Sequence, residues 1–142
     1  MARYYKYRSP EELEAGARAL GLDIPTSQDL SVLLSPCQVG DRTVKNRMVV
    51  QPMEGCDGTL DGTPGELTIR RYQRFGDGGA AVIWAEATAI AENARMNPRQ
   101  LWLAEHTQRA IGEMIEICRR SHRAANGSTG DLLVGLQLTH SG

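Results

Sequence analysis

Two apolar runs limit the fold of this chain more than any other feature of its sequence. Residues 80–89 read AAVIWAEATA and residues 132–138 read LLVGLQL, with few polar side chains in either run. Strands that are buried on both faces beneath covering helices have this pattern. A third apolar stretch ends at Val49 and Val50, directly before Gln51. The chain is therefore predicted to be an α/β protein with parallel strands.

Helical patterns fill the intervals between these three strands. We predict a first helix that opens at residues 63–66 and runs to about Phe75, where the glycines of residues 76–79 end it. A second, amphipathic helix is predicted from Thr107 to about Ala125. The order strand, helix, strand, helix, strand predicts right-handed βαβ units. This order suits an open sheet and a barrel equally well.

The N-terminal part of the chain has a different pattern. Residues 1–30 are predicted to form a helical extension outside the main domain, which we assign to residues 31–142. Ser9 and Pro10 are typical of the N-cap and the first position of a helix. Residues 37–50 are predicted to form a tight hairpin that runs into an apolar strand.

The charge balance and the cysteines exclude several classes of protein. The chain has 16 basic and 17 acidic residues, which gives no basic face for nucleic acid. No run of ~20 apolar residues is present, so we expect no membrane partner. Three widely spaced cysteines without a CxxC pair favour a reducing cytoplasm and indicate neither a disulfide framework nor a metal site.

Chemistry in parallel α/β folds gathers at the carboxyl ends of the strands. Residues 52–56, 86–88 and 137–140 follow or end the three predicted strands. Neither a P-loop nor a GxGxxG fingerprint after a strand occurs in the sequence. This absence argues against a nucleotide hydrolase and against a classical nicotinamide-binding fold. A GxSxG elbow and an HExxH motif are absent as well.

Three segments together resemble the old yellow enzyme family. Residues 33–53, LLSPCQVGDRTVKNRMVVQPM, resemble its opening hairpin and first barrel strand, including the pair Asn46-Arg47. Residues 76–88, GDGGAAVIWAEAT, resemble the second strand, and residues 134–142, VGLQLTHSG, resemble the third. The resemblance implies the N-terminal part of an FMN-binding (β/α)₈ TIM barrel. A complete barrel needs ~250 residues, so we expect this one to remain unclosed.

The resemblance also implies a set of cofactor-binding positions. These are Gln51, Pro52, Met53, Glu54, Ala87 and Gln137. In the family, the positions of Pro52 and Met53 lie against the flavin ring, and the small residue at Ala87 brings its backbone amide to the flavin. The amide at the position of Gln137 pairs with the pyrimidine end of the ring, where a donor and an acceptor are both needed.

Two positions depart from the family pattern. Glu54 stands where many members have Thr or Cys, and a carboxylate beside the flavin would disfavour the anionic reduced form. Cys56 stands where some members have a substrate-contacting Tyr, so we assign it to substrate binding. The family's substrate-orienting pair, proton donor and phosphate-holding groups lie later in the barrel, so the catalytic residues are unknown here.

Plain structural roles are open for several of these side chains. Pro52 can simply end a strand, and Met53 and Gln137 can be core residues. For Glu86 we favour a buried ion-pair partner, for an arginine such as Arg47, over a catalytic residue.

The resemblance implies an FMN-dependent oxidoreductase that passes hydride from NADH or NADPH through FMN to an activated alkene, a small-molecule substrate. The isolated chain is expected to be inactive. The alternative is a non-catalytic truncated chain that self-associates as a homo-oligomer or requires a complementing chain, because an unpaired strand edge favours association.

Overall fold

A computed structural model describes residues 7–141 of the chain. These residues divide into two compact units, with the division between Val32 and Leu33. Each unit is described by itself. Within the described residues, no helix is both long enough and apolar enough to cross a membrane.

The first unit contains one full helix, α1 (Pro10–Ala19). Ser9 is its N-cap, and the Ser9 hydroxyl accepts a hydrogen bond from the amide of Glu12 at 3.3 Å. The helix predicted in this region is therefore confirmed, together with its start. A short helix, α2 (Ser31–Leu34), follows and was not predicted.

The second unit is built on a parallel sheet in the order β3 (Val49–Val50), β4 (Val82–Ala89) and β5 (Leu133–Thr139). Both strand pairings are parallel, as the apolar runs predicted. In the described residues the sheet has only these three strands and does not close into a barrel.

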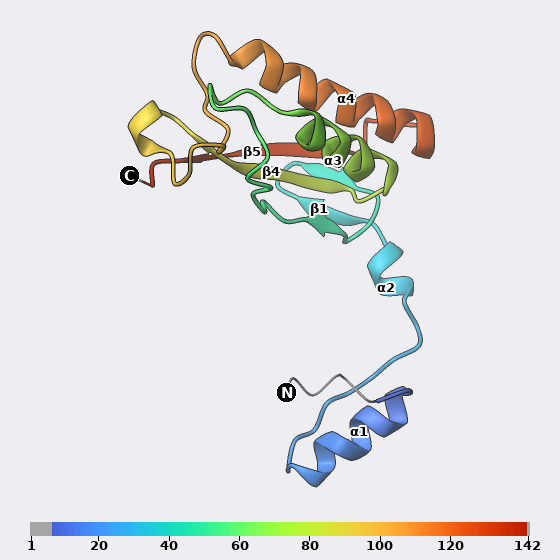
Figure 1. Ribbon diagram of the computed structural model, residues 1–142. Helices are drawn as coiled ribbons and strands as arrows, with labels where there is room; N and C mark the ends of the chain where they lie inside the picture. The colour runs from blue at the N-terminus through green and yellow to red at the C-terminus, as the bar shows by residue number, and fades with distance from the viewer. Residues whose placement is uncertain (1–6, 142) are drawn as a thin grey trace. The chain divides into compact units, whose positions relative to one another are not determined.

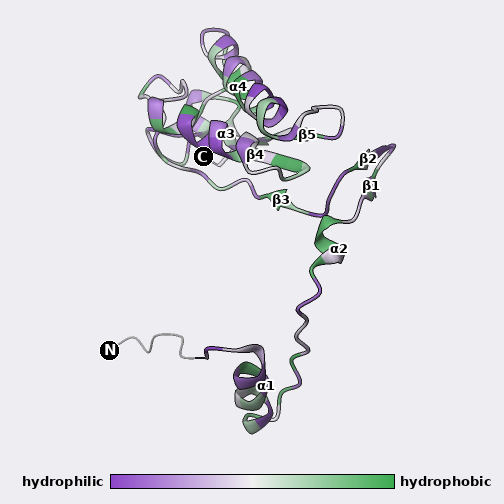
Figure 2. Ribbon diagram, turned by 90° about the vertical axis from the view of Figure 1, so that its right-hand side faces the viewer, coloured by the Kyte–Doolittle hydropathy of each residue, from purple (hydrophilic) through white to green (hydrophobic). Residues whose placement is uncertain are grey.

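Two helices cover one face of this sheet (Figure 1). They are α3 (Glu66–Asp77) and α4 (Gln108–Asn126), both amphipathic. The ribbon of α4 changes between hydrophobic and hydrophilic colours along its length (Figure 2), as expected for a helix with one buried face. The core between helices and sheet consists of Tyr72, Ile83, Ala85, Leu101, Ile111, Met114, Cys118 and Leu132.

A two-stranded hairpin precedes the sheet, as predicted. It pairs β1 (Cys37–Val39) with β2 (Arg42–Val44), and the left-handed Gly40 lies in its turn. Val44 is buried and packs with Ala81 and Val82 at the start of β4.

Asn46, from the motif Asn46-Arg47, fastens the hairpin region to β4. Its amide nitrogen donates to the carbonyl of Gly79 at 2.9 Å. Its amide oxygen accepts from the backbone N–H groups of Met48 and Ala81 at 3.1 and 3.0 Å. Asn46 is 6% exposed, and each of these side-chain hydrogen bonds is to a backbone group. Its role is therefore structural.

Gly76 corrects one prediction about α3. The sequence suggested that Gly76 helps to end the helix, but α3 continues through Asp77 and has its C-cap at Gly78. Gly76 lies instead where α3 crosses α4, with the backbone carbonyl of Cys118 directly against its Cα hydrogens. Its lack of a side chain allows the close approach of the two helices.

His122 of α4 is fully buried beside a lysine. The Nε2 atom of His122 lies 3.1 Å from the Nζ atom of Lys45, and the same Nζ atom lies 3.4 Å from the carboxylate of Asp131. An ammonium group can only donate, so the Nε2 atom must accept and the ring must be neutral. Burial, with the Lys45 charge as a further cause, holds the pKa of His122 below its ordinary value of 6.5.

The free energy of unfolding is therefore expected to fall as the pH drops below 6.5. In that range the unfolded chain binds a proton at His122 more readily than the folded chain does, so a falling pH favours unfolding, with a slope of at most about 1.4 kcal/mol per pH unit. Urea unfolding between about pH 7 and about pH 5 would measure this slope. His122→Gln should flatten this slope, and His106→Gln, at an exposed position, is the matched control. Equal slopes in the wild type and His122→Gln would contradict the prediction.

Candidate functional site

The carboxyl ends of β3, β4 and β5 lie at the same edge of the sheet because the strands are parallel. Pairing of β4 with β5 shifts register there: Ala85 is opposite Leu136 and Thr88 is opposite Leu138. Two residues of β4, Glu86 and Ala87, thus face one residue of β5, Gln137. Such a bulge re-aims side chains, and bulges are common beside functional sites.

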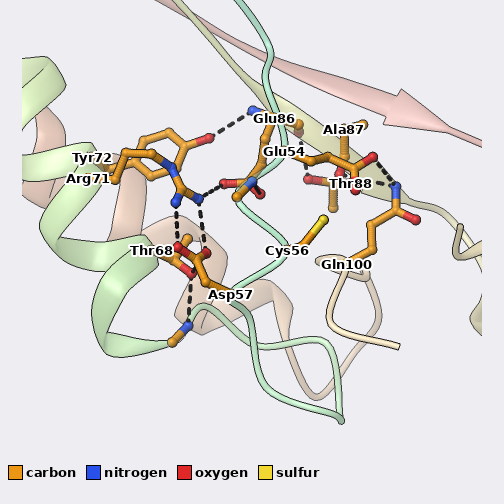
Figure 3. A network of polar contacts seen from close by, with 12 residues as sticks. Glu54, Cys56, Asp57, Thr68, Arg71, Tyr72, Glu86, Ala87, Thr88 and Gln100 are labelled. Atoms are coloured by element: carbon orange, nitrogen blue, oxygen red, sulfur yellow. Dashed lines mark hydrogen bonds and ion pairs between the residues drawn. The ribbon is translucent and has the colours of Figure 1, made fainter. Parts of the chain in front are cut away.

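An arginine from α3 occupies the first polar cluster at this edge (Figure 3). Arg71 pairs with Asp57 at 2.5 Å and with Glu86 at 2.6 Å. The second carboxylate oxygen of Glu86 accepts from the amide of Gly55 at 3.3 Å, and the Tyr72 hydroxyl accepts from the amide of Glu86 at 2.8 Å. The cluster connects the loop after β3, helix α3 and the bulge of β4.

The charges in this cluster stabilise one another. Burial alone would raise the pKa of Asp57, but hydrogen bonds from Arg71 and Thr68 hold it below its ordinary value. Burial alone would lower the pKa of Arg71, but the carboxylates of Asp57 and Glu86 raise it. Asp57 and Arg71 are therefore both charged at neutral pH.

This geometry corrects the predicted partner of Glu86. The interpretation of Glu86 as a buried ion-pair residue is confirmed, since it is 4% exposed and bound to arginine. The arginine is Arg71, however, and not Arg47, whose Nε atom donates to the hydroxyl of Ser35 at 3.1 Å. Arg47 belongs to the hairpin region and does not pair with this end of β4.

Glu54 and two amide side chains form the second polar cluster. The carboxylate of Glu54 accepts from the Nδ2 atom of Asn97 and from the Nε2 atom of Gln100, both at 3.1 Å. The same Nε2 atom lies 3.3 Å from the carbonyl oxygen of Ala87. Partial burial raises the pKa of Glu54, the amide of Asn97 opposes the rise, and the charge of Glu86 adds to it.

Gln100 thus brings two of the predicted cofactor positions, Glu54 and Ala87, together. Ala87 is buried, and Gln137 is half-buried on β5 opposite the bulge. No side-chain hydrogen bond of Gln137 is found within residues 7–141. The amide of Gln137 is therefore available as a donor and an acceptor.

The remaining predicted positions lie on the loop after β3. Gln51 is exposed, Pro52 is half-buried, and Met53 is 78% exposed, which excludes a core role for Met53 in the described residues. Cys56 is exposed, with its backbone in the left-handed region at a φ of 50°. The sulfur of Cys56 accepts from the Nδ2 atom of Asn97 at 3.4 Å, so Cys56 and Glu54 share one amide.

Four polar residues of the site were missed by the sequence reasoning. They are Asp57, Arg71, Asn97 and Gln100. Asp57 directly follows residues 52–56, the segment that the sequence placed after the first strand, and Arg71 lies on a helix whose orientation the sequence does not fix. No signal in the sequence separates Gln100 from other loop amides. Within the described residues, no three His, Cys, Asp or Glu side chains are arranged to hold a metal ion.

Known proteins share this arrangement of strands and helices. No family model matches the chain. An NADPH dehydrogenase of Geobacillus sp. (strain WCH70) is 32% identical over 116 residues, which make up 79% of this chain and 31% of the relative. The structure of morphinone reductase in complex with tetrahydroNAD, an N189A mutant, has a TM-score of 0.60 and 26% identity over 78% of this chain and 27% of that chain.

The chain belongs to the old yellow enzyme / NADPH dehydrogenase family and matches its N-terminal part. The old yellow enzyme from Trypanosoma cruzi has the same fold over 79% of this chain, with a TM-score of 0.62 and 24% identity. The chain spans about 31% of the length of the curated relative described above. The structure thus corresponds to the first strands of the old yellow enzyme TIM barrel, together with their helices.

Proposed function

We propose that this chain forms the ring-facing part of an FMN site in an NAD(P)H-dependent oxidoreductase. The proposal depends chiefly on one observation, the bulge of β4 that sets the small, buried Ala87 opposite the uncommitted amide of Gln137. A flat ring with polar edges needs close approach to a backbone and one side chain that both donates and accepts. Both are present at neighbouring strand ends.

The residues at the strand ends fit a flavin ring in most respects. Gln137 would pair with the pyrimidine edge, the backbone at Ala87 would approach the ring, and the exposed Met53 with Pro52 would offer an apolar surface to it. Glu54 is the departure, because its carboxylate adds negative charge beside the ring. Gln51 stays a proposed cofactor contact, and Cys56 a proposed substrate contact.

Bound FMN would supply a redox ring that carries hydride between a nicotinamide and a substrate alkene. The residues of this chain would orient the ring and shield part of it from water. NADH or NADPH is proposed as the reductant, in keeping with the relatives named NADPH dehydrogenase and morphinone reductase in complex with tetrahydroNAD. An activated alkene is the proposed class of substrate.

Titration of the chain with FMN, followed by flavin fluorescence, tests the proposal. We expect saturable binding that Gln137→Leu weakens about tenfold, because two neutral hydrogen bonds contribute roughly 1.4 kcal/mol. Gln73→Leu is the matched control, since Gln73 is an exposed glutamine on the surface of α3. Absence of saturable binding, or equal affinity in Gln137→Leu and the wild type, would refute the assignment.

A second candidate function is self-association or completion by another chain. One face of the sheet packs on the helices through Ile83 and Ala85, and alternation places Trp84 on the other face, where it is 48% exposed. Val49 of β3 is 45% exposed. Light scattering during size exclusion should show a dimer or a larger assembly, and a stable monomer would exclude self-association.

A further inference from the structure

Gln100 is the most completely bonded side chain at the carboxyl edge of the sheet. It is 1% exposed, although it lies in an irregular segment between the short helix η1 (Glu92–Ala94) and α4. Its Nε2 atom lies 3.1 Å from the Glu54 carboxylate and 3.3 Å from both the Ala87 carbonyl and the Thr139 hydroxyl. One amide group thus contacts the loop after β3, the end of β4 and the end of β5.

The orientation of this amide is fixed by a donor on its other side. The Oε1 atom of Gln100 accepts from the backbone N–H of Met96 at 2.6 Å. Rotating the amide by half a turn would set two acceptors, the Glu54 carboxylate and the Ala87 carbonyl, against Oε1 and leave two donors facing each other at Met96. The N–H groups of Gln100 must therefore face Glu54.

The backbone after Gln100 is anchored to β4. The amide of Ala89 donates to the carbonyl of Leu101 at 2.8 Å, and the amide of Leu103 donates to the carbonyl of Ala89 at 2.8 Å. Trp102 forms a parallel bridge with Ala89. Gln100 therefore projects from a segment held by the sheet.

Glu54, by contrast, lies on a loop without regular structure. Its side chain is held by Asn97 and Gln100, and both amides come from the segment before α4. The amide of Asn97 favours the charged form of this carboxylate, against the effect of burial. The amide of Gln100 donates to the other carboxylate oxygen, and a hydrogen bond to the charged form favours that form. The position of this carboxylate thus depends on two side chains that lie far from Glu54 in the sequence.

We propose that Gln100 is a positioning residue that fixes the carboxylate of Glu54 beside the flavin-ring position. There the charge of this carboxylate favours binding of the oxidised over the reduced cofactor. The second part rests on the proposed function, and the first part does not. A fixed negative charge next to the ring opposes the negative charge that a flavin gains on reduction. Gln100 acts through Glu54 and is not itself assigned a contact with the cofactor.

Nuclear magnetic resonance of the chain without cofactor tests the first part. The two side-chain N–H signals of Gln100 should shift with pH along the titration of Glu54 in the wild type, and Glu54→Gln should abolish that shift. In Gln100→Leu the pKa of Glu54 should rise further above its ordinary value, because the charged form loses a donor. Gln108→Leu, at an exposed position on α4, should leave it unchanged.

The wild-type titration does not depend on the folding of any variant. It therefore tests the first part of the proposal even if Gln100→Leu fails to fold. If the side-chain signals of Gln100 do not shift during the titration of Glu54, the positioning role is overturned. The second part is tested with FMN: Glu54→Gln should raise the affinity for reduced relative to oxidised flavin about tenfold. An unchanged ratio in a chain that binds FMN would overturn this part, whereas failure to bind FMN would refute the proposed function and, with it, the selection of oxidised flavin.

Discussion

Replacement of Arg71 by methionine is expected to lower the free energy of unfolding by about 3–5 kcal/mol, the cost of leaving a buried carboxylate without its partner. Glu86 is 4% exposed and Arg71 holds it at 2.6 Å. Asp57 loses the same partner in the variant. Methionine keeps most of the side-chain volume, so the loss reports on charge and not on a cavity.

Urea unfolding at neutral pH measures this loss, with Arg70→Met as the matched control. Arg70 is the exposed neighbour of Arg71 on α3, and surface substitutions of this kind usually change stability by less than about 0.5 kcal/mol. Adding Glu86→Gln to Arg71→Met should recover part of the loss, since it removes the unpaired charge. Equal stability of Arg71→Met and Arg70→Met would show that the cluster contributes nothing to the fold.

The same cluster shows where prediction from the sequence ends. Glu86 could be identified as a buried ion-pair residue because a single carboxylate interrupts an apolar strand. Its partner could not be identified, because Arg71 reaches it from a helix whose rotation is set by packing of Tyr72 beneath it. The predicted partner, Arg47, lies directly before the first strand of the sheet. Its side chain donates a hydrogen bond to Ser35 instead.

The parallel sheet was predictable for a related reason. Seven of the eight residues of β4 are buried, and the largely apolar run that results is visible in the sequence without knowledge of the neighbouring strands. The bulge opposite Gln137 was not predictable, since a register shift depends on two strands that are far apart in the sequence. Gln100 was missed because the three contacts of its Nε2 atom come from three separate segments, all of them distant from Gln100 in the sequence.

Gly76→Ala is expected to destabilise the protein by about 1–3 kcal/mol, although alanine favours helices over glycine by up to about 1 kcal/mol. An added methyl group would collide with the backbone carbonyl of Cys118 and lie 2.9 Å from the Cβ atom of Ser121. A carbonyl cannot turn aside as a flexible side chain can. Relief of the collision therefore requires α3 and α4 to separate.

Gly112→Ala supplies the matched control within the same helix pair. Gly112 lies inside α4, is exposed, and has no atom within 4 Å of an added methyl group. That variant should gain up to about 1 kcal/mol from helix propensity alone. The two variants, compared by chemical denaturation, should therefore change stability in opposite directions. If both stabilise the protein, the close crossing at Gly76 does not limit the packing of α3 on α4.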